Sequence, residues 1–385
     1  MLVVAGSVVC VVAATAGCSS SSRPGHGSTT AEDEFRDSVV STATSQAHSL
    51  TVTDKGEVYG FGANPAGVLG DDTTTGKAKP ARVTGLPDVT TVSTGQKHSL
   101  AVTGNGDVYA WGANEYGQLG DGTSKSRTEP ARVTGLSDIA RVAAGGAHSL
   151  AVTEAGDVYT WGSNITGQLG DGTNKDRAEP VRVEKLSDVT TVSTTGAHSL
   201  AVTEAGDVYA WGANEQGTLG DETVDELTKP ERVSDLSDVT AVSTGPSHSL
   251  AATESGEVHS WGSNEYGQLG DGTHKDRTAP THVAGLSDVT AVAAGSAHSL
   301  AVTEAGDVYT WGNNTHGELG DDTTEKQTEP ANVAGLTGVS NVSAGTSHSL
   351  AASEDGGLYA WGLNSEGELG DGTKHERHEP VRVGD

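Results

Sequence analysis

A 50-residue internal repeat is the feature that most constrains the fold of this 385-residue chain. The tripeptide His-Ser-Leu recurs at that interval without insertion or deletion, and seven copies fill residues 36–385. Its histidines are His48, His98, His148, His198, His248, His298 and His348. A fixed period of this length indicates one array of supersecondary units rather than several independent domains.

Each repeat contains four short segments rich in β-branched and aromatic residues and shows no helical periodicity. The repeat over residues 89–138 reads "VTTVSTGQKHSLAVTGNGDVYAWGANEYGQLGDGTSKSRTEPARVTGLSD". Gly106 precedes its third segment, at a position typical of a tight hairpin with positive φ. We expect strands at Val89–Ser93, Ser99–Thr103, Val108–Trp111 and Ala131–Val133, the last one after a proline.

Four antiparallel strands in each of seven repeats predict an all-β fold, a single seven-bladed β-propeller of four-stranded antiparallel blades. Closing a ring of blades hides the sheet edges. An open solenoid is the alternative, but it needs polar capping repeats, and here the first and last copies resemble the middle ones. The sequence leaves ring closure open: the strand around Val381–Val383 either completes the blade that begins near Val39, or each repeat is a whole blade.

Two recurring apolar positions are expected to fill the spaces between blades. Leu119 and its equivalents recur in every copy, and a tryptophan stands at the position of Trp111 in six of the seven. Phe61 takes the tryptophan position in the first copy, which keeps the flat apolar ring and loses the indole N–H. This substitution favours a packing role for the position over chemistry specific to indole.

The first residues have the pattern of an export signal. Residues 1–17, "MLVVAGSVVCVVAATAG", are small and apolar, precede Cys18, and are followed by a Ser-rich polar stretch. They resemble a bacterial lipoprotein signal, which implies cleavage before Cys18 and acylation of that cysteine. We expect a signal peptide at 1–17, a flexible linker at 18–35 and the propeller at 36–385. A short transmembrane anchor is the alternative.

These boundaries place the protein outside the cytoplasm, either anchored to the cell envelope or extracellular, and touching membrane only through its lipid. Cys10 and Cys18 are the two cysteines of the sequence, so the propeller needs no disulfide. The 52 acidic residues outnumber the 23 basic ones, giving a formal charge of -29. That field repels phosphate backbones, so we expect no nucleic acid partner.

A residue repeated in every unit occupies equivalent places around a ring, whereas catalysis needs one asymmetric constellation. We therefore expect each His-Ser-Leu imidazole to bond neighbouring backbone, and Asp121 and its equivalents to satisfy N–H groups of their turn. His375 and His378, in "KHERHE", are weak metal candidates, because zinc lacks a third and fourth ligand there. We expect no catalytic residue, metal or cofactor.

The copies differ mainly at three places: the two residues after the Asn at the position of Asn114, the six before each proline, and the residues just before His-Ser-Leu. Repeat proteins place such variation in loops on one face, which is often the binding face. Exposed aromatic residues there are favoured anchors, so Tyr116, Tyr266 and His316 are our candidate partner contacts. Neutral drift among recent duplicates is the alternative.

Together, "HSLAVT", "GDVYAWG" and "NEYGQLGDGT" resemble the repeats of the regulator of chromosome condensation family. The resemblance implies a seven-bladed propeller whose loops grip another protein. Members of that family include a nuclear exchange factor for a small GTPase, plant ultraviolet photoreceptors, modules of ubiquitin ligases and a secreted bacterial β-lactamase inhibitor. The photoreceptor's "GWRHT" motif is replaced here by "GQKHS", "GGAHS" and "GPSHS".

We therefore expect a monomeric, non-enzymatic scaffold whose loops bind a protein or a cell-surface polymer. Three alternatives remain. The first is a guanine nucleotide exchange factor for a small GTPase, and the second is a secreted inhibitor similar to the propeller-type β-lactamase inhibitor. The third is an enzyme such as a lyase or hydrolase, for which the sequence offers no unique acid–base pair.

Overall fold

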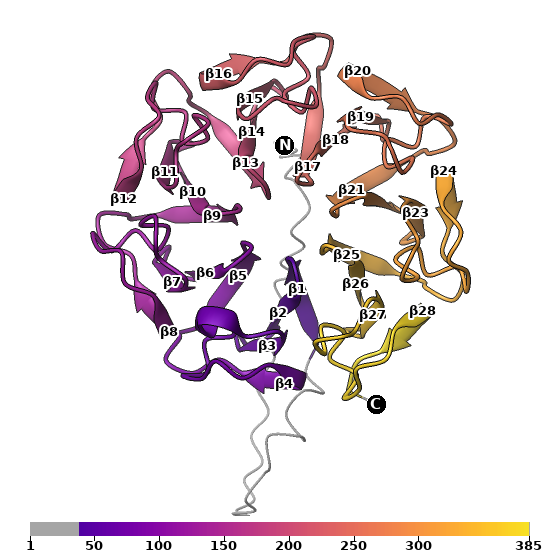
Figure 1. The fold of residues 1–385 in the computed structure, drawn as a ribbon, viewed down its shortest axis with the longest axis horizontal. Helices are drawn as coiled ribbons and strands as arrows, with labels where there is room; N and C mark the ends of the chain where they lie inside the picture. The colour runs from indigo at the N-terminus through magenta and orange to yellow at the C-terminus, as the bar shows by residue number, and fades with distance from the viewer. Residues whose placement is uncertain (1–37, 385) are drawn as a thin grey trace, which may run out of the picture.

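The computed structural model describes residues 38–384, which form a closed ring of seven four-stranded sheets (Figure 1). The predicted seven-bladed all-β propeller is therefore confirmed. Blade 1 contains β1 (Val39–Thr44), β2 (His48–Thr53), β3 (Val58–Gly62) and β4 (Lys77–Arg82), with a short 3-10 helix, η1 (Pro65–Gly67), before β4. Sequence order is also spatial order within every sheet.

The other blades repeat this pattern. Their strands are β5 (Val89–Thr94), β6 (His98–Thr103), β7 (Val108–Gly112), β8 (Arg127–Arg132), β9 (Ile139–Ala144), β10 (His148–Thr153), β11 (Val158–Gly162), β12 (Arg177–Arg182), β13 (Val189–Thr194), β14 (His198–Thr203), β15 (Val208–Gly212), β16 (Leu227–Arg232), β17 (Val239–Thr244), β18 (His248–Thr253), β19 (Val258–Gly262), β20 (Arg277–Val283), β21 (Val289–Ala294), β22 (His298–Thr303), β23 (Val308–Gly312), β24 (Gln327–Asn332), β25 (Val339–Ala344), β26 (His348–Ser353), β27 (Leu358–Gly362) and β28 (Arg377–Arg382).

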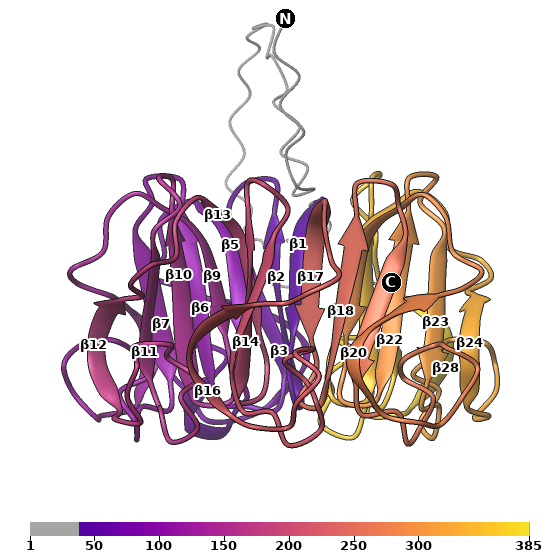
Figure 2. The same cartoon turned by 90° about the horizontal axis from the view of Figure 1, so that it is seen from above.

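The first strand of each blade lies nearest the ring axis and the fourth lies at the rim (Figure 1). The strands run between the two faces of a disc (Figure 2). Because neighbouring strands are antiparallel, the turns at 45–47 and the loops at 63–76 lie on one face, with their equivalents; we call it the loop face. The turns at 54–57 and the linkers at 83–88 lie on the other, which we call the hairpin face.

Each repeat is a whole blade, which decides the question of ring closure. Strand β28 pairs with β27 and β1 pairs with β2, so no strand crosses the seam between blades 7 and 1. At the seam, the Val39 N–H donates to Gly356 O (3.2 Å) and the Gly372 N–H donates to Ala78 O (2.8 Å). Equivalent backbone bonds join blades 1 and 2, where the Val89 N–H donates to Gly56 O (3.0 Å).

The fourth strand differs from the prediction. In blade 2 it spans Arg127–Arg132 and contains Pro130, whereas we expected it to begin at Ala131 and reach Val133. The register jumps between the pairs Ala110↔Ala131 and Gly112↔Arg127, so the intervening residues bulge. A proline is tolerated there because this is the outer edge strand, where no N–H is needed for the ladder.

Apolar packing occurs mainly between blades. Leu219 of blade 4 and Trp261 of blade 5 lie fully buried in one cluster, as the sequence predicted for both positions. The indole N–H of Trp261 donates to Thr218 O (2.7 Å). A Cβ at Gly220 (φ 71°) would lie 3.0 Å from that indole nitrogen, so glycine permits the close approach. Phe61 packs with Leu369 at the seam.

We predict that Trp211→Phe costs only about 1 kcal/mol of unfolding free energy, because the carbonyl of Gln168 keeps its second donor, the Ser199 hydroxyl. Trp211→Ala should cost about 3–5 kcal/mol through the cavity it leaves. Urea denaturation of both variants measures the difference. Equal losses would contradict the packing role and assign the stabilisation to the N–H.

Candidate functional site

The histidines of the repeat link adjacent blades through serine hydroxyls. The partner of each histidine is the serine of the His-Ser-Leu tripeptide in the next blade, as Ser249 is for His198. The distance from histidine Nε2 to serine Oγ is 2.9–3.5 Å at the seven interfaces, and His348 bonds Ser49 across the seam. Each serine hydroxyl donates to a loop carbonyl, as Ser249 does to Thr218 O (3.0 Å). Since the hydroxyl has one hydrogen, the imidazole must carry its proton on Nε2 and donate it.

This arrangement corrects the predicted partner of these histidines, which is a side chain of the next blade and not local backbone. Burial lowers the pKa of His48, His148, His248 and His348 to about 3, and that of His98, His198 and His298 to about 4. The imidazoles are therefore neutral at neutral pH. They are also enclosed, so they do not form a solvent-accessible site.

Constant polar residues hold the loops of the loop face. Asn114 Nδ2 donates to Asp121 Oδ1 (3.2 Å), and Asn114 Oδ1 accepts the Leu119 N–H (2.9 Å). Asp121 also accepts the Thr123 N–H (3.0 Å), which confirms the predicted role of this aspartate, and binds Arg127 (2.7 Å). Burial alone would raise the pKa of Asp121, but the hydrogen bonds from Thr123 and Arg127 outweigh it and lower the pKa.

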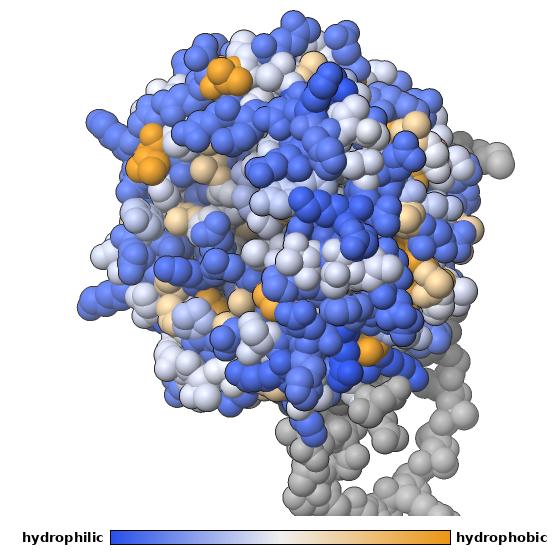
Figure 3. Space-filling model, turned by 45° about the vertical axis from the view of Figure 1, so that its right-hand side comes forward, coloured by the Kyte–Doolittle hydropathy of each residue, from blue (hydrophilic) through white to orange (hydrophobic). Residues whose placement is uncertain are grey.

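The positions that vary among repeats lie on this same face, in its turns and loops and at the start of each fourth strand. Three of these variable positions, one in each of blades 2, 3 and 4, carry exposed hydrophobic side chains. They are Tyr116 (45% exposed), Ile165 (68%) and Val224 (56%). Figure 3 shows apolar side chains scattered singly over a mostly polar surface. Ile165 and Val224 were missed by our preference for aromatic residues, although both fall within the variable segments of the sequence.

Tyr116 lines a cavity of about 520 Å³ between blades 2 and 3. Glu115 and Lys125 belong to the same blade as Tyr116, and Asp176 and Ala178 of the next blade complete this part of the wall. The Tyr116 side chain makes no hydrogen bond to any residue in 38–384. It is therefore available as an anchor for an external group.

The other two predicted contacts are engaged by the following blade. The Lys326 ammonium lies 4.7 Å from the ring centre of Tyr266, within cation–π range. His316 Nδ1 lies 2.9 Å from Glu376 Oε1. Asp176 takes the place of Lys326 beside Tyr116, so no equivalent cation covers that ring. Of the three candidates, Tyr116 is thus the most available for binding.

The predicted metal candidates do not form a ready-made site. His378 Nε2 lies 3.8 Å from Glu376 Oε2, whereas His316 contacts the other oxygen of that carboxylate group. Over residues 38–384, no three His, Cys, Asp or Glu side chains form a group able to hold a metal. Cys18, the predicted lipid attachment residue, lies outside the described residues. In the described part of the chain, no helix is long and apolar enough to cross a membrane.

We predict strong acid destabilisation from the buried histidines. Their folded pKa lies below the unfolded value of about 6.5, so the unfolded chain binds more protons, and stability present above pH 6.5 is lost as the pH falls toward 4. Between the folded and unfolded pKa values each histidine contributes a slope of about 1.4 kcal/mol per pH unit, and the seven together contribute roughly 10 kcal/mol per pH unit.

Urea unfolding at several pH values between 7 and 5 measures this slope. Removing one imidazole with His198→Gln should reduce the slope by about 1.4 kcal/mol per pH unit, whereas His274→Gln, at an exposed histidine, is the control. An unchanged slope in His198→Gln would contradict the linkage.

Comparison with known proteins agrees with this architecture. The model of the RCC1-like domain matches residues 8–199 and 184–384. The structure of human WBSCR16 is 26% identical with a TM-score of 0.76, over 83% of this chain and 88% of that one. Prp20p of Saccharomyces cerevisiae is 24% identical with a TM-score of 0.77, over 93% and 90%. The latter likeness shows the fold alone. No curated protein matches the sequence.

Proposed function

Because the chain belongs to the family of RCC1-like domains, we propose that it is a non-enzymatic scaffold that binds a protein partner through its loop face. The observation that carries this proposal is the separation of constant and variable residues. Constant residues build the blade interfaces and brace the loops, while the most variable segments lie on the loop face. Tyr116, Ile165 and Val224 are the exposed apolar anchors among them.

The shape and charge of the loop face favour a folded or peptide partner. Hot spots of protein interfaces are enriched in aromatic side chains that fill pockets, and Tyr116 lines a cavity large enough to accept a side chain. The segment after Val224 is acidic, "DEL", and the whole chain carries a charge of -29. A partner with basic groups around an apolar centre fits this face, whereas nucleic acid does not.

Similar proteins support a protein as the class of partner. Yeast RCC1 (Prp20), 23% identical to this chain with a TM-score of 0.76 over 97% of this chain and 91% of that one, has been crystallised with Kap60 bound. Binding of Prp20p to Gsp1p and histones has also been characterised. Nucleotide exchange and enzyme inhibition are narrower forms of such binding, and no feature of the loop face favours either one.

The proposal can be tested by substitution on the two faces. Tyr116→Ala, Ile165→Ser and Val224→Ser together should abolish capture of the partner from cell-envelope extracts and, with the purified partner, should weaken binding at least tenfold, about 1.4 kcal/mol. Glu154→Ser, Glu204→Ser and Glu304→Ser on the hairpin face form the matched control. Loss of binding in the control alone would place the partner on the wrong face and overturn the proposal.

We further propose that the scaffold acts outside the cytoplasm as a lipoprotein, with residues 1–17 removed and Cys18 acylated. The support is the sequence of that segment, which lies outside the described residues. Mass spectrometry of the mature protein should find Cys18 as the first residue with a diacylglyceryl group, and Cys18→Ser should release the protein from the membrane fraction. A mature chain that retains residues 1–17 would contradict this localisation.

A further inference from the structure

A pair of histidines in blade 5 replaces the residues found at the same place on the hairpin face of the other blades. At this cross-strand position five blades pair tyrosine with arginine, as in Tyr209↔Arg232, and blade 6 pairs Tyr309 with Asn332. Blade 5 instead pairs His259 of β19 with His282 of β20. Their rings meet edge to face, with centroids 5.8 Å apart and planes at 74°.

The histidine at position 282 also leaves the Glu257 carboxylate without the arginine partner that its equivalents have in blades 1 to 4. In blades 1 to 4 the arginine of this pair binds the acidic residue that ends the hairpin, as Arg182 binds Asp157 (2.5 Å). Blade 5 has His282 in place of that arginine, and no lysine or arginine within residues 38–384 forms a salt bridge with Glu257. Glu257 lies just before β19, and it lines the same cavity as His259.

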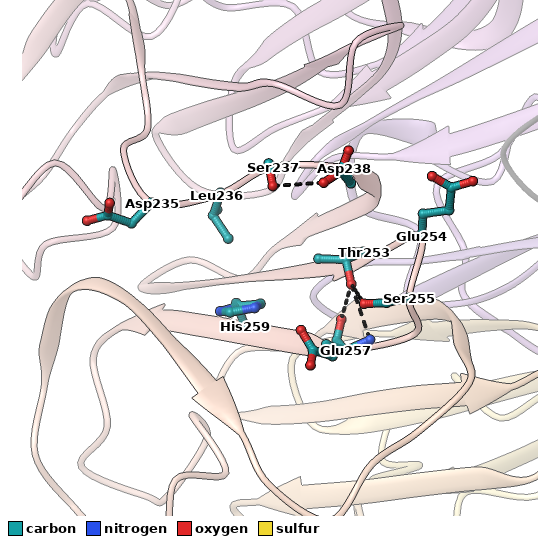
Figure 4. Close-up of a pocket in the computed structure, with 9 residues that line it drawn as sticks. All are labelled: Asp235, Leu236, Ser237, Asp238, Thr253, Glu254, Ser255, Glu257 and His259. Carbon is teal, nitrogen blue, oxygen red and sulfur yellow. Dashed lines mark hydrogen bonds between the residues drawn. The ribbon is translucent and has the colours of Figure 1, made fainter.

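Glu257 and His259 border a cavity of about 430 Å³ between blades 4 and 5. Figure 4 shows the linker residues Asp235 to Asp238 on one side, with Glu257 and His259 on the other. Glu254 adds a further carboxylate to the wall. The surroundings therefore attract a cation, while the two adjacent imidazoles supply nitrogen ligands that alkali and alkaline-earth ions do not prefer.

We propose that His259 and His282 bind a divalent transition-metal ion such as Ni²⁺, Cu²⁺ or Zn²⁺, with Glu257 as the third ligand. Cross-strand neighbours are close enough for two imidazoles to share one ion, and imidazole with carboxylate suits these metals. The β19–β20 ladder continues past the pair to Val258↔Val283, which fixes both Cα positions. Coordination then requires rotation of side chains only, since no ready-made group of three exists in residues 38–384.

The repeat supplies substitutions that remove the pair without inventing new packing. His259→Tyr with His282→Arg installs the residues of five other blades. The matched control, His375→Lys with His378→Thr, removes the second histidine pair with residues found in other copies. Glu257→Gln tests the third ligand. Tyr309→His with Asn332→His transfers the imidazole pair to blade 6, where Asp307 stands in the position of Glu257.

Titration of the metal-free chain with NiCl₂ by isothermal calorimetry provides the measurement, with circular dichroism to verify folding. We expect the parent chain to bind one equivalent of Ni²⁺. Binding should be at least tenfold weaker in the His259/His282 variant, weaker in Glu257→Gln and unchanged in the His375/His378 variant. The blade 6 variant should bind a second equivalent of Ni²⁺.

The proposal is overturned if the parent chain binds no Ni²⁺, or if removing His375 and His378 abolishes a binding that removing His259 and His282 leaves intact. Unchanged affinity in Glu257→Gln would overturn its assignment as a ligand. A blade 6 variant that gains no site would contradict the sufficiency of the cross-strand pair.

Discussion

The hydrogen bond from a buried imidazole to a serine hydroxyl of the next blade is the interaction on which the ring depends. It recurs at every interface, including the seam from His348 to Ser49. The same serine donates to a loop carbonyl, and in six blades that carbonyl also accepts an indole N–H. One backbone oxygen thus connects the strands near the axis to the loop face, and it orients the loops relative to the ring.

Strand direction then determines where variation is tolerated. The turns and loops of the loop face, with the start of each fourth strand, contain the most variable segments of the repeat, whereas the hairpin face varies less and is acidic. A partner approaching the loop face meets different side chains at each blade, although the backbone beneath them is the same. The backbone of the ring is therefore symmetric, while the side chains that a partner contacts differ from blade to blade.

The sequence was sufficient to predict the propeller, because the period and the strand boundaries are local properties. The Trp and Leu positions were also predictable, since recurrence of a large apolar residue indicates packing. The serine partner of each histidine was not, because it belongs to the next blade and depends on how blades are placed. For the same reason, the sequence did not show that Lys326 covers Tyr266 and that Glu376 engages His316. That His259 faces His282 was missed because it depends on the register of the fourth strand, which a bulge shifts.

Completeness of every blade has a consequence for how the polypeptide is connected. Because no strand is shared across the seam, the join between blades 7 and 1 keeps the interblade backbone bonds and the histidine–serine bond of the other six, with Phe61 in place of the tryptophan. Circular permutants opened at another interblade linker would therefore keep the same pairs of facing blades and the same histidine–serine bonds between them.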